Sequence, residues 1–85
     1  MEEIIEARAY LETVQALGNE WRISHPLTGG STMNLGEMLS LSEDAVRQGN
    51  PNQAREIALL VSAYSLLAIS QSRSNRSVTP RYFQN

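Results

Sequence analysis

The side chains with the most chemical potential stand close together in this 85-residue chain. The segment "GNEWRISHPLTGG" (18–30) holds the only tryptophan, Trp21, and the only histidine, His25, with Arg22 between them. A histidine is a common metal ligand and general base. The chain has no second histidine, no cysteine, and only Glu20 as an acid within ten residues of His25. We therefore predict a loop histidine that caps the chain or packs beside the neighbouring proline.

Other groups with catalytic potential have simpler structural interpretations. Glu43 and Asp44 are adjacent, and adjacent residues on a helix point about 100° apart, so they do not form a paired-carboxylate site. Ser62 and Ser65 lie in no G-x-S-x-G turn and have no histidine nearby. The Gly-Gly pair at 29–30 has no lysine after it and no strand before it, unlike a phosphate-binding loop. We predict that the protein is not an enzyme and holds no metal or cofactor.

Length, charge and cysteine content narrow the function classes. Eighty-five residues form one domain with a small core, and such domains often gain stability by associating with a partner. The net charge of −2 disfavours non-specific binding to nucleic acid. The absence of cysteine excludes disulfides and thiolate sites. Met1 is followed by two glutamates, unlike a signal peptide, so we expect a cytoplasmic location unless the chain is a trimmed mature form.

The hydrophobic pattern predicts an all-α fold of three helices. An irregular loop over residues 24–33 follows the first helix, because a proline and two glycines interrupt the pattern there. The first helix is predicted over residues 2–21, with a weak last turn at the Gly-Asn pair of 18–19; the alternative is an end at residue 18 with a brief restart through residue 21. Apolar or small residues recur along it at spacings of three and four. These residues are Ile4, Ala7, Leu11, Val14, Gly18 and Trp21.

The last two helices are predicted to form a tight antiparallel hairpin. Asn34 and Glu37 have the form of a capping box at the start of the second helix, which runs to about residue 48. Gly49 ends that helix, and the Asn-Pro pair at 50–51 opens the third, which runs to about residue 72. The predicted core face of the second helix is Leu35, Met38, Leu39, Ala45 and Val46. Its predicted solvent face is Ser40, Ser42, Glu43 and Asp44.

The middle of the third helix, "IALLVSAYSLLAI" (57–69), is apolar on nearly every side. Thirteen residues are too few to span a membrane. A helix that is apolar all round must be covered all round, and two other short helices are not enough to do so. We therefore expect a second chain against it. Ala58, Ser62 and Ser65 form a shallow groove that allows a helix to approach closely.

Residues 73–85 show no helical period and are predicted to form an extended tail beside a helical domain over 1–72. Three arginines with two aromatic residues at its end would give only weak, salt-sensitive nucleic-acid binding, so a nucleic-acid partner is not expected. The alternative is a clamp on an acidic partner or on the chain's own acidic first helix. We expect a protein partner or a homo-oligomer, because Trp and Arg are enriched at binding hot spots. The candidate partner-binding residues are Trp21, Arg22, Tyr64, Arg81, Tyr82 and Phe83.

Two segments together resemble the small SoxXA-binding proteins. They are "GNEWR" (18–22) and "SEDAVRQGNPNQAREIALLVSAYSLLAISQ" (42–71). The family pattern has a Gly-x-x-Trp-Arg segment at the end of a first helix, followed by a helical hairpin with a Gly-Asn turn. The matching residues are Gly18, Trp21, Arg22, Gly49, Asn50, Ala54 and Gln71. The resemblance covers about two thirds of the chain, and the loop after Arg22 is longer than the pattern has.

The resemblance implies a non-catalytic accessory subunit. Such a protein binds and stabilises a c-type cytochrome complex that starts thiosulfate oxidation, and it lies in the periplasm after removal of a signal peptide. The alternative is a self-contained, homo-oligomeric helical module of the cytoplasm with a regulatory or phage-related role.

Overall fold

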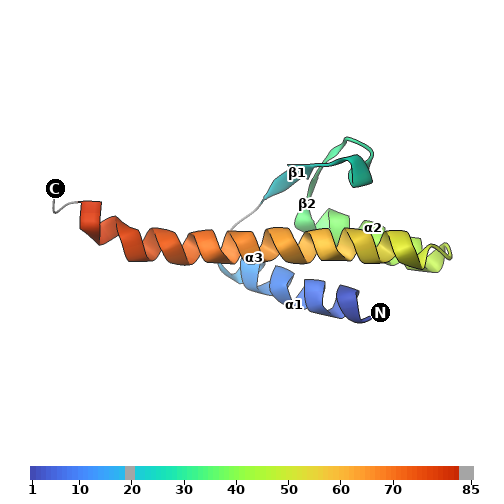
Figure 1. Cartoon of the computed structure of the whole chain (residues 1–85), viewed down its shortest axis with the longest axis horizontal. Helices are drawn as coiled ribbons and strands as arrows, with labels where there is room; N and C mark the ends of the chain where they lie inside the picture. The colour runs from blue at the N-terminus through green and yellow to red at the C-terminus, as the bar shows by residue number, and fades with distance from the viewer. Residues whose placement is uncertain (19–20, 83–85) are drawn as a thin grey trace.

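A computed structural model describes residues 1–18 and 21–82, with side chains described as far as residue 73. The elements in chain order are α1 (Glu2–Ala16), β1 (Arg22–Ser24), η1 (Pro26–Thr28), β2 (Thr32–Asn34), α2 (Leu35–Arg47) and α3 (Pro51–Tyr82). α1 and α2 both pack against α3, the longest helix (Figure 1). The described part of the chain is mostly helical, as predicted, and also contains a small two-stranded sheet that was not expected.

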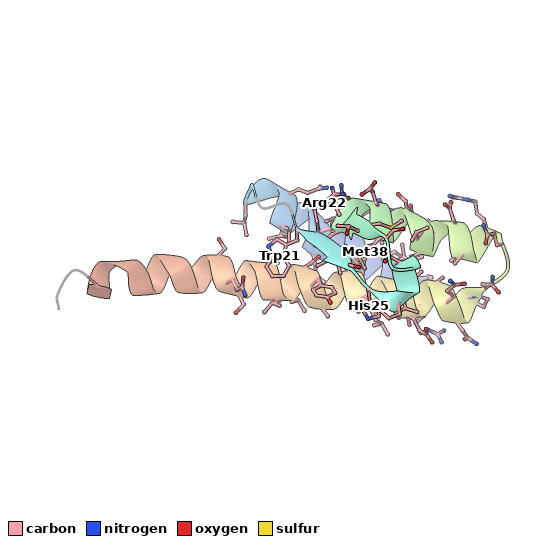
Figure 2. All side chains as sticks on the ribbon, turned by 90° about the horizontal axis from the view of Figure 1, so that it is seen from above. Trp21, Arg22, His25 and Met38 are labelled. Carbon is pink, nitrogen blue, oxygen red and sulfur yellow. The ribbon has the colours of Figure 1, made fainter. Side chains whose placement is uncertain are left out.

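α1 ends at Ala16, so the prediction of a helix through residue 21 is wrong. Gly18 adopts a φ of +77°, a left-handed conformation in which glycine commonly ends a helix. Trp21 therefore lies beyond α1, directly before β1 (Figure 2). Inside the helix the predicted inward positions are covered at least in part. They are Ile4, which is half-buried, and Ala7, Leu11 and Val14, which are buried.

The predicted loop over 24–33 is instead most of a β-hairpin. β1 and β2 are antiparallel, with Ile23 opposite Met33, and Ile23 is buried. The connection contains η1 and then Gly29 and Gly30, whose φ values of +70° and +80° let the chain turn back. Each strand has only three residues. Such short strands cannot show the alternation by which a strand is recognised in a sequence.

The hairpin of α2 and α3 forms as predicted. The Asn34 side chain accepts a hydrogen bond from the Glu37 N–H at 2.8 Å, and the Glu37 carboxylate accepts one from the Asn34 N–H at 2.9 Å. After α2, Gly49 has a φ of +81°, and the Asn50 N–H donates to the Ala45 carbonyl at 2.8 Å. This pattern is a Schellman motif. It reverses the chain into α3 at the next residue.

For two residues of α2, the burial is the opposite of what was predicted. Ser42 was expected to face water but is fully buried, and its hydroxyl donates to the Ala54 carbonyl of α3 at 2.5 Å. Val46 was expected in the core but is 43% exposed. A buried serine is tolerated where its hydroxyl finds a partner, and that partner lies on another helix. The burial of Ser42 cannot be predicted from the hydrophobic pattern of α2 alone.

α3 continues through Tyr82, well beyond the predicted end near residue 72. The prediction of an extended tail is therefore wrong for residues 73–82, and Phe83 lies outside the described residues. The last part of α3 runs past the other helices (Figure 1). Extending an existing helix requires no new nucleation, so it does not need an apolar stripe of its own. The absence of a hydrophobic period in residues 73–82 therefore did not exclude a helix there.

Two clusters of buried side chains hold the other elements on α3. The larger joins all three helices and β1, and Met38, Ile57 and Val61 are fully buried there. The smaller joins Val14 near the end of α1 to Ala68 and Ile69 of α3. Together they position the link that carries Trp21.

Candidate partner-binding surfaces

One side of α3 is covered by the chain and the opposite side is not. Leu59, Leu66 and Leu67 are 52%, 47% and 46% exposed. We call the line of exposed residues at alternating spacings of three and four the outer face; it consists of Glu56, Leu59, Ala63, Leu66, Ser70 and Arg73. The buried side consists of Ala54, Ile57, Ala58, Val61, Ser65, Ala68 and Ile69.

This division tests part of the prediction for helix 57–69. The chain itself covers the inner side, including Ala58 and Ser65 of the predicted groove, so that groove is filled from within. The leucines of the outer side have about half of their surface in solvent. The expectation of a second chain against this side stays a prediction, now restricted to one face. The sequence showed that the segment was apolar, but not which side its own chain would leave open.

Trp21 packs at the junction of the two clusters. It is half-buried and contacts both of them. Its ring centroid lies 6.5 Å from that of Tyr64 on α3, with 57° between the ring planes. Such tilted aromatic pairs are favourable beyond the area they bury. The sequence left open whether Trp21 is core or interface anchor, and its contacts give it a packing role while leaving part of the ring exposed.

A cavity of about 290 Å³ lies beside Trp21. Its size is near the lower limit of small-molecule sites and suits a single inserted side chain. Sequence reasoning missed it because three separate segments build it: the end of α1, the link before β1 and the start of α2. The lining residues are Leu11, Val14, Gln15, Gly18, Trp21, Asn34, Leu35 and Gly36.

The other candidate binding residues do not gather at Trp21. Arg22 is exposed, and its guanidinium donates to the Thr32 carbonyl across the hairpin at 3.4 Å. Arg81 and Tyr82 lie on the last turn of α3. About 26 Å of helix separates them from Tyr64, at 1.5 Å per residue. The structure therefore brings Trp21 and Tyr64 together and places the predicted C-terminal clasp elsewhere.

His25 has the structural role that was predicted. Its Nδ1 accepts a hydrogen bond from the Leu27 N–H at 3.1 Å and so caps η1. The Thr28 hydroxyl lies 2.7 Å from the His25 carbonyl and 2.8 Å from the Ser31 carbonyl, which closes the turn. One ring nitrogen and the backbone carbonyl of His25 thus both take part in holding this turn.

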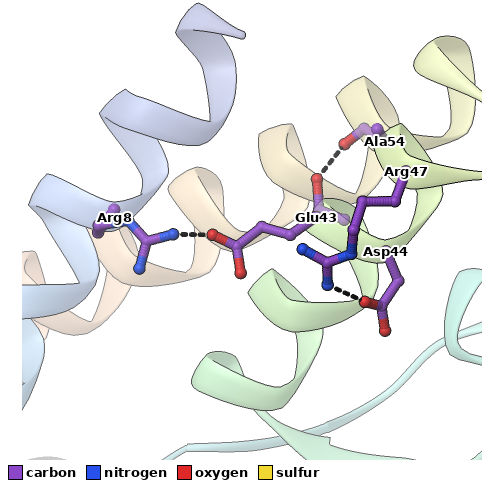
Figure 3. Close-up of polar contacts among 6 residues, drawn as sticks. Arg8, Glu43, Asp44, Arg47 and Ala54 are labelled. Carbon is purple, nitrogen blue, oxygen red and sulfur yellow. Dashed lines mark hydrogen bonds and ion pairs between the residues drawn. The ribbon is translucent and has the colours of Figure 1, made fainter.

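The adjacent acids of α2 point to different partners (Figure 3). Glu43 forms an ion pair with Arg8 of α1, and Asp44 forms one with Arg47 a turn further along α2. They do not make a paired-carboxylate site, as predicted. In the part of the chain that the structure describes, no three acidic or histidine side chains gather where a metal ion would bind.

No family model, curated protein or solved structure matches the chain. Over the described residues, none of the helices combines the length and apolar character needed to cross a membrane.

Proposed function

We propose that this protein is a non-catalytic protein-binding module, and that another protein chain covers the outer face of α3. One observation carries the proposal. Leu59, Leu66 and Leu67 are about half exposed on a helix whose opposite side is fully buried. Single exposed leucines are common on protein surfaces, but exposed apolar residues that follow one another along one face of a helix, here residues 59, 63 and 66, mark an interaction site.

The resemblance to SoxXA-binding proteins makes this proposal more specific, because it names a partner and a compartment. In that form the protein is a periplasmic accessory subunit that docks on a c-type cytochrome complex of thiosulfate oxidation and stabilises it. The Gly-x-x-Trp-Arg segment supports this form by its position. Gly18 ends α1, Trp21 borders the cavity, and Arg22 follows Trp21 in the chain with its guanidinium bonded to the Thr32 carbonyl. A partner side chain inserted into the cavity would contact the aromatic ring of Trp21.

A self-contained homo-oligomer is the second candidate, and one observation favours it. A second copy would bring an identical set of exposed leucines, Leu59, Leu66 and Leu67, against this face.

Site-specific photo-crosslinking in the cells that make the protein tests the proposal. A photoreactive phenylalanine analogue at Leu66 should yield a defined covalent adduct, because a partner covers that position. The same analogue at Glu12, an exposed residue of α1, is the matched control. Mass spectrometry identifies the adduct, and absorbance in the haem Soret band decides whether the partner is a cytochrome. Equal, diffuse labelling at both positions would contradict the proposed function.

A further inference from the structure

We infer that His25 is a pH-sensitive switch: when its imidazole gains a second proton, the cap on η1 is lost and Leu27 is released from its packing against the helices. This switch lies in the β-hairpin and goes beyond the proposed protein-binding function, on which it does not depend. We call residues 25–31, which join β1 to β2 through η1, the connection. His25, the only histidine of the chain, is its first residue (Figure 2).

One hydrogen bond of the connection requires a neutral imidazole. The Leu27 N–H donates to the Nδ1 of His25 at 3.1 Å, and we call this the capping bond. Nδ1 accepts it with its lone pair, so the proton of the neutral ring is on Nε2. In the imidazolium both ring nitrogens carry a proton and neither can accept. Among the described residues Nδ1 is the only partner of this N–H, so a second proton leaves the N–H unsatisfied and sets two donors against each other.

Leu27 connects the capping bond to the interior of the protein. Its side chain is half-buried and packs against the larger cluster. Leu27 and Thr28 also line a cavity of about 270 Å³, whose other walls include Leu41 of α2 and Ile57 of α3. The connection therefore forms one wall of this cavity. When the Leu27 backbone loses its hydrogen bond, this wall loosens and apolar surface inside the cavity becomes accessible.

The other hydrogen bonds of the connection do not respond to the same change of pH. The Thr28 and Gly30 N–H groups both donate to the His25 carbonyl, at 2.9 and 3.2 Å, and the Thr28 hydroxyl lies 2.8 Å from the Ser31 carbonyl. Amides and hydroxyls do not titrate between pH 5 and 8, where imidazole does. These bonds keep the two strands joined, so the response is confined to Leu27 and its surroundings while the helices stay intact.

The charged groups around the connection are already paired or bonded. α2 presents Asp44 to the cavity, and Asp44 is paired with Arg47. α3 and β2 present only uncharged side chains to it. On β1, the Arg22 guanidinium donates to the Thr32 carbonyl. A carboxylate paired with the imidazole would favour the charged ring, but His25 forms no ion pair within the described residues. The charged ring thus loses a donor partner and gains no new one.

Nuclear magnetic resonance of the intact chain tests the switch between about pH 8 and about pH 5, where histidine changes its charge. The ring resonances of His25 report its protonation, and the Leu27 amide resonance reports the capping bond. We expect both to move with the same midpoint. Protection of the Leu27 amide against hydrogen exchange should fall several-fold, after correction for the direct effect of pH. Broadening of the Leu27 methyl resonances by a soluble gadolinium chelate should increase over the same range.

His25→Asn is the matched control. Asparagine is a good N-cap acceptor that does not titrate, so it should hold the Leu27 N–H at every pH and abolish the response. His25→Ala should leave the Leu27 amide free at every pH. Asp44→Asn removes the titratable side chain that lines the cavity and should leave the response in place. Circular dichroism checks that each variant stays helical.

Three results would overturn the switch. The first is a Leu27 amide resonance that stays in place while His25 titrates. The second is the same response in the His25→Asn chain, which would assign it to another group. The third is an imidazole that stays neutral until the helices unfold, because the capping bond would then never open in the folded protein.

Discussion

Two buried serines show how much the surroundings of one residue type can differ. Ser42 and Ser65 are both fully buried. The Ser42 hydroxyl donates to the Ala54 carbonyl at 2.5 Å and so joins α2 to α3. The Ser65 hydroxyl has no hydrogen-bond partner within the described residues. A buried hydroxyl without a partner loses its hydration and gains nothing in return.

We expect opposite effects from replacing these two serines by alanine. Ser42→Ala removes a buried hydrogen bond and should lower the free energy of unfolding by about 1 kcal/mol or more. Ser65→Ala removes an unsatisfied group and should leave the free energy of unfolding unchanged or raise it by up to about 1 kcal/mol. Urea unfolding followed by circular dichroism measures both. An equal loss in the two variants would show that Ser65 has a partner in solution.

At the scale of the elements, the short β-hairpin depends on side chains that fasten it to the helices. Strands of three residues are not stable by themselves. Ile23 is buried in the larger cluster, and Trp21, just before β1, contacts both clusters and Tyr64. These contacts attach the link between α1 and the hairpin to the middle of α3.

Trp21→Ala should therefore destabilise the fold. It removes a half-buried ring from the junction of two clusters, and we expect a loss of about 2–3 kcal/mol in the free energy of unfolding. Trp21→Phe keeps most of the contact area and should cost less than half as much. Circular dichroism is the suitable probe, because either change removes the only tryptophan fluorophore. Unchanged stability with a weakened complex would instead identify Trp21 as an interface anchor.

At the scale of the whole molecule, α3 is the spine of an elongated shape of 56 × 25 × 17 Å. α1 and α2 lie along it, and the hairpin rises at the level of α2 (Figure 1). The outer face runs along the same helix on the side that these elements leave uncovered. A dimer through this face would give α3 neighbours on both sides.

A dimer of this kind makes thermal stability depend on protein concentration. Association favours the folded chain by mass action, so Tm should rise by a few degrees for each tenfold increase in concentration near the dissociation constant. Leu66→Glu places a charge in the middle of the outer face, which prevents self-association there, so the Tm of this variant should not depend on concentration. Differential scanning calorimetry at several concentrations measures this. A constant Tm in the unaltered chain would contradict self-association through the outer face.

Several features were determined by residues close together in the sequence. The capping box of Asn34 and Glu37, the turn at Gly49 and the cap formed by His25 each join atoms within five residues, so a short window contains all the information. The inward stripe of α1 was visible for the same reason. Gly18 was recognised as a weak point, but the helix was still extended to Trp21 because Gly18 and Trp21 also continue the apolar stripe.

The remaining features were decided by which elements meet. Trp21 contacts Tyr64, the hydroxyl of Ser42 reaches Ala54, and the cavity takes its walls from three segments. Burial in such places depends on contacts between residues far apart in the chain, and a local pattern does not contain them. For the same reason, the sequence determined that the middle of α3 is apolar on nearly every side. Only the tertiary structure decided that the outer face, with Leu59 and Leu66, is the side its own chain leaves open.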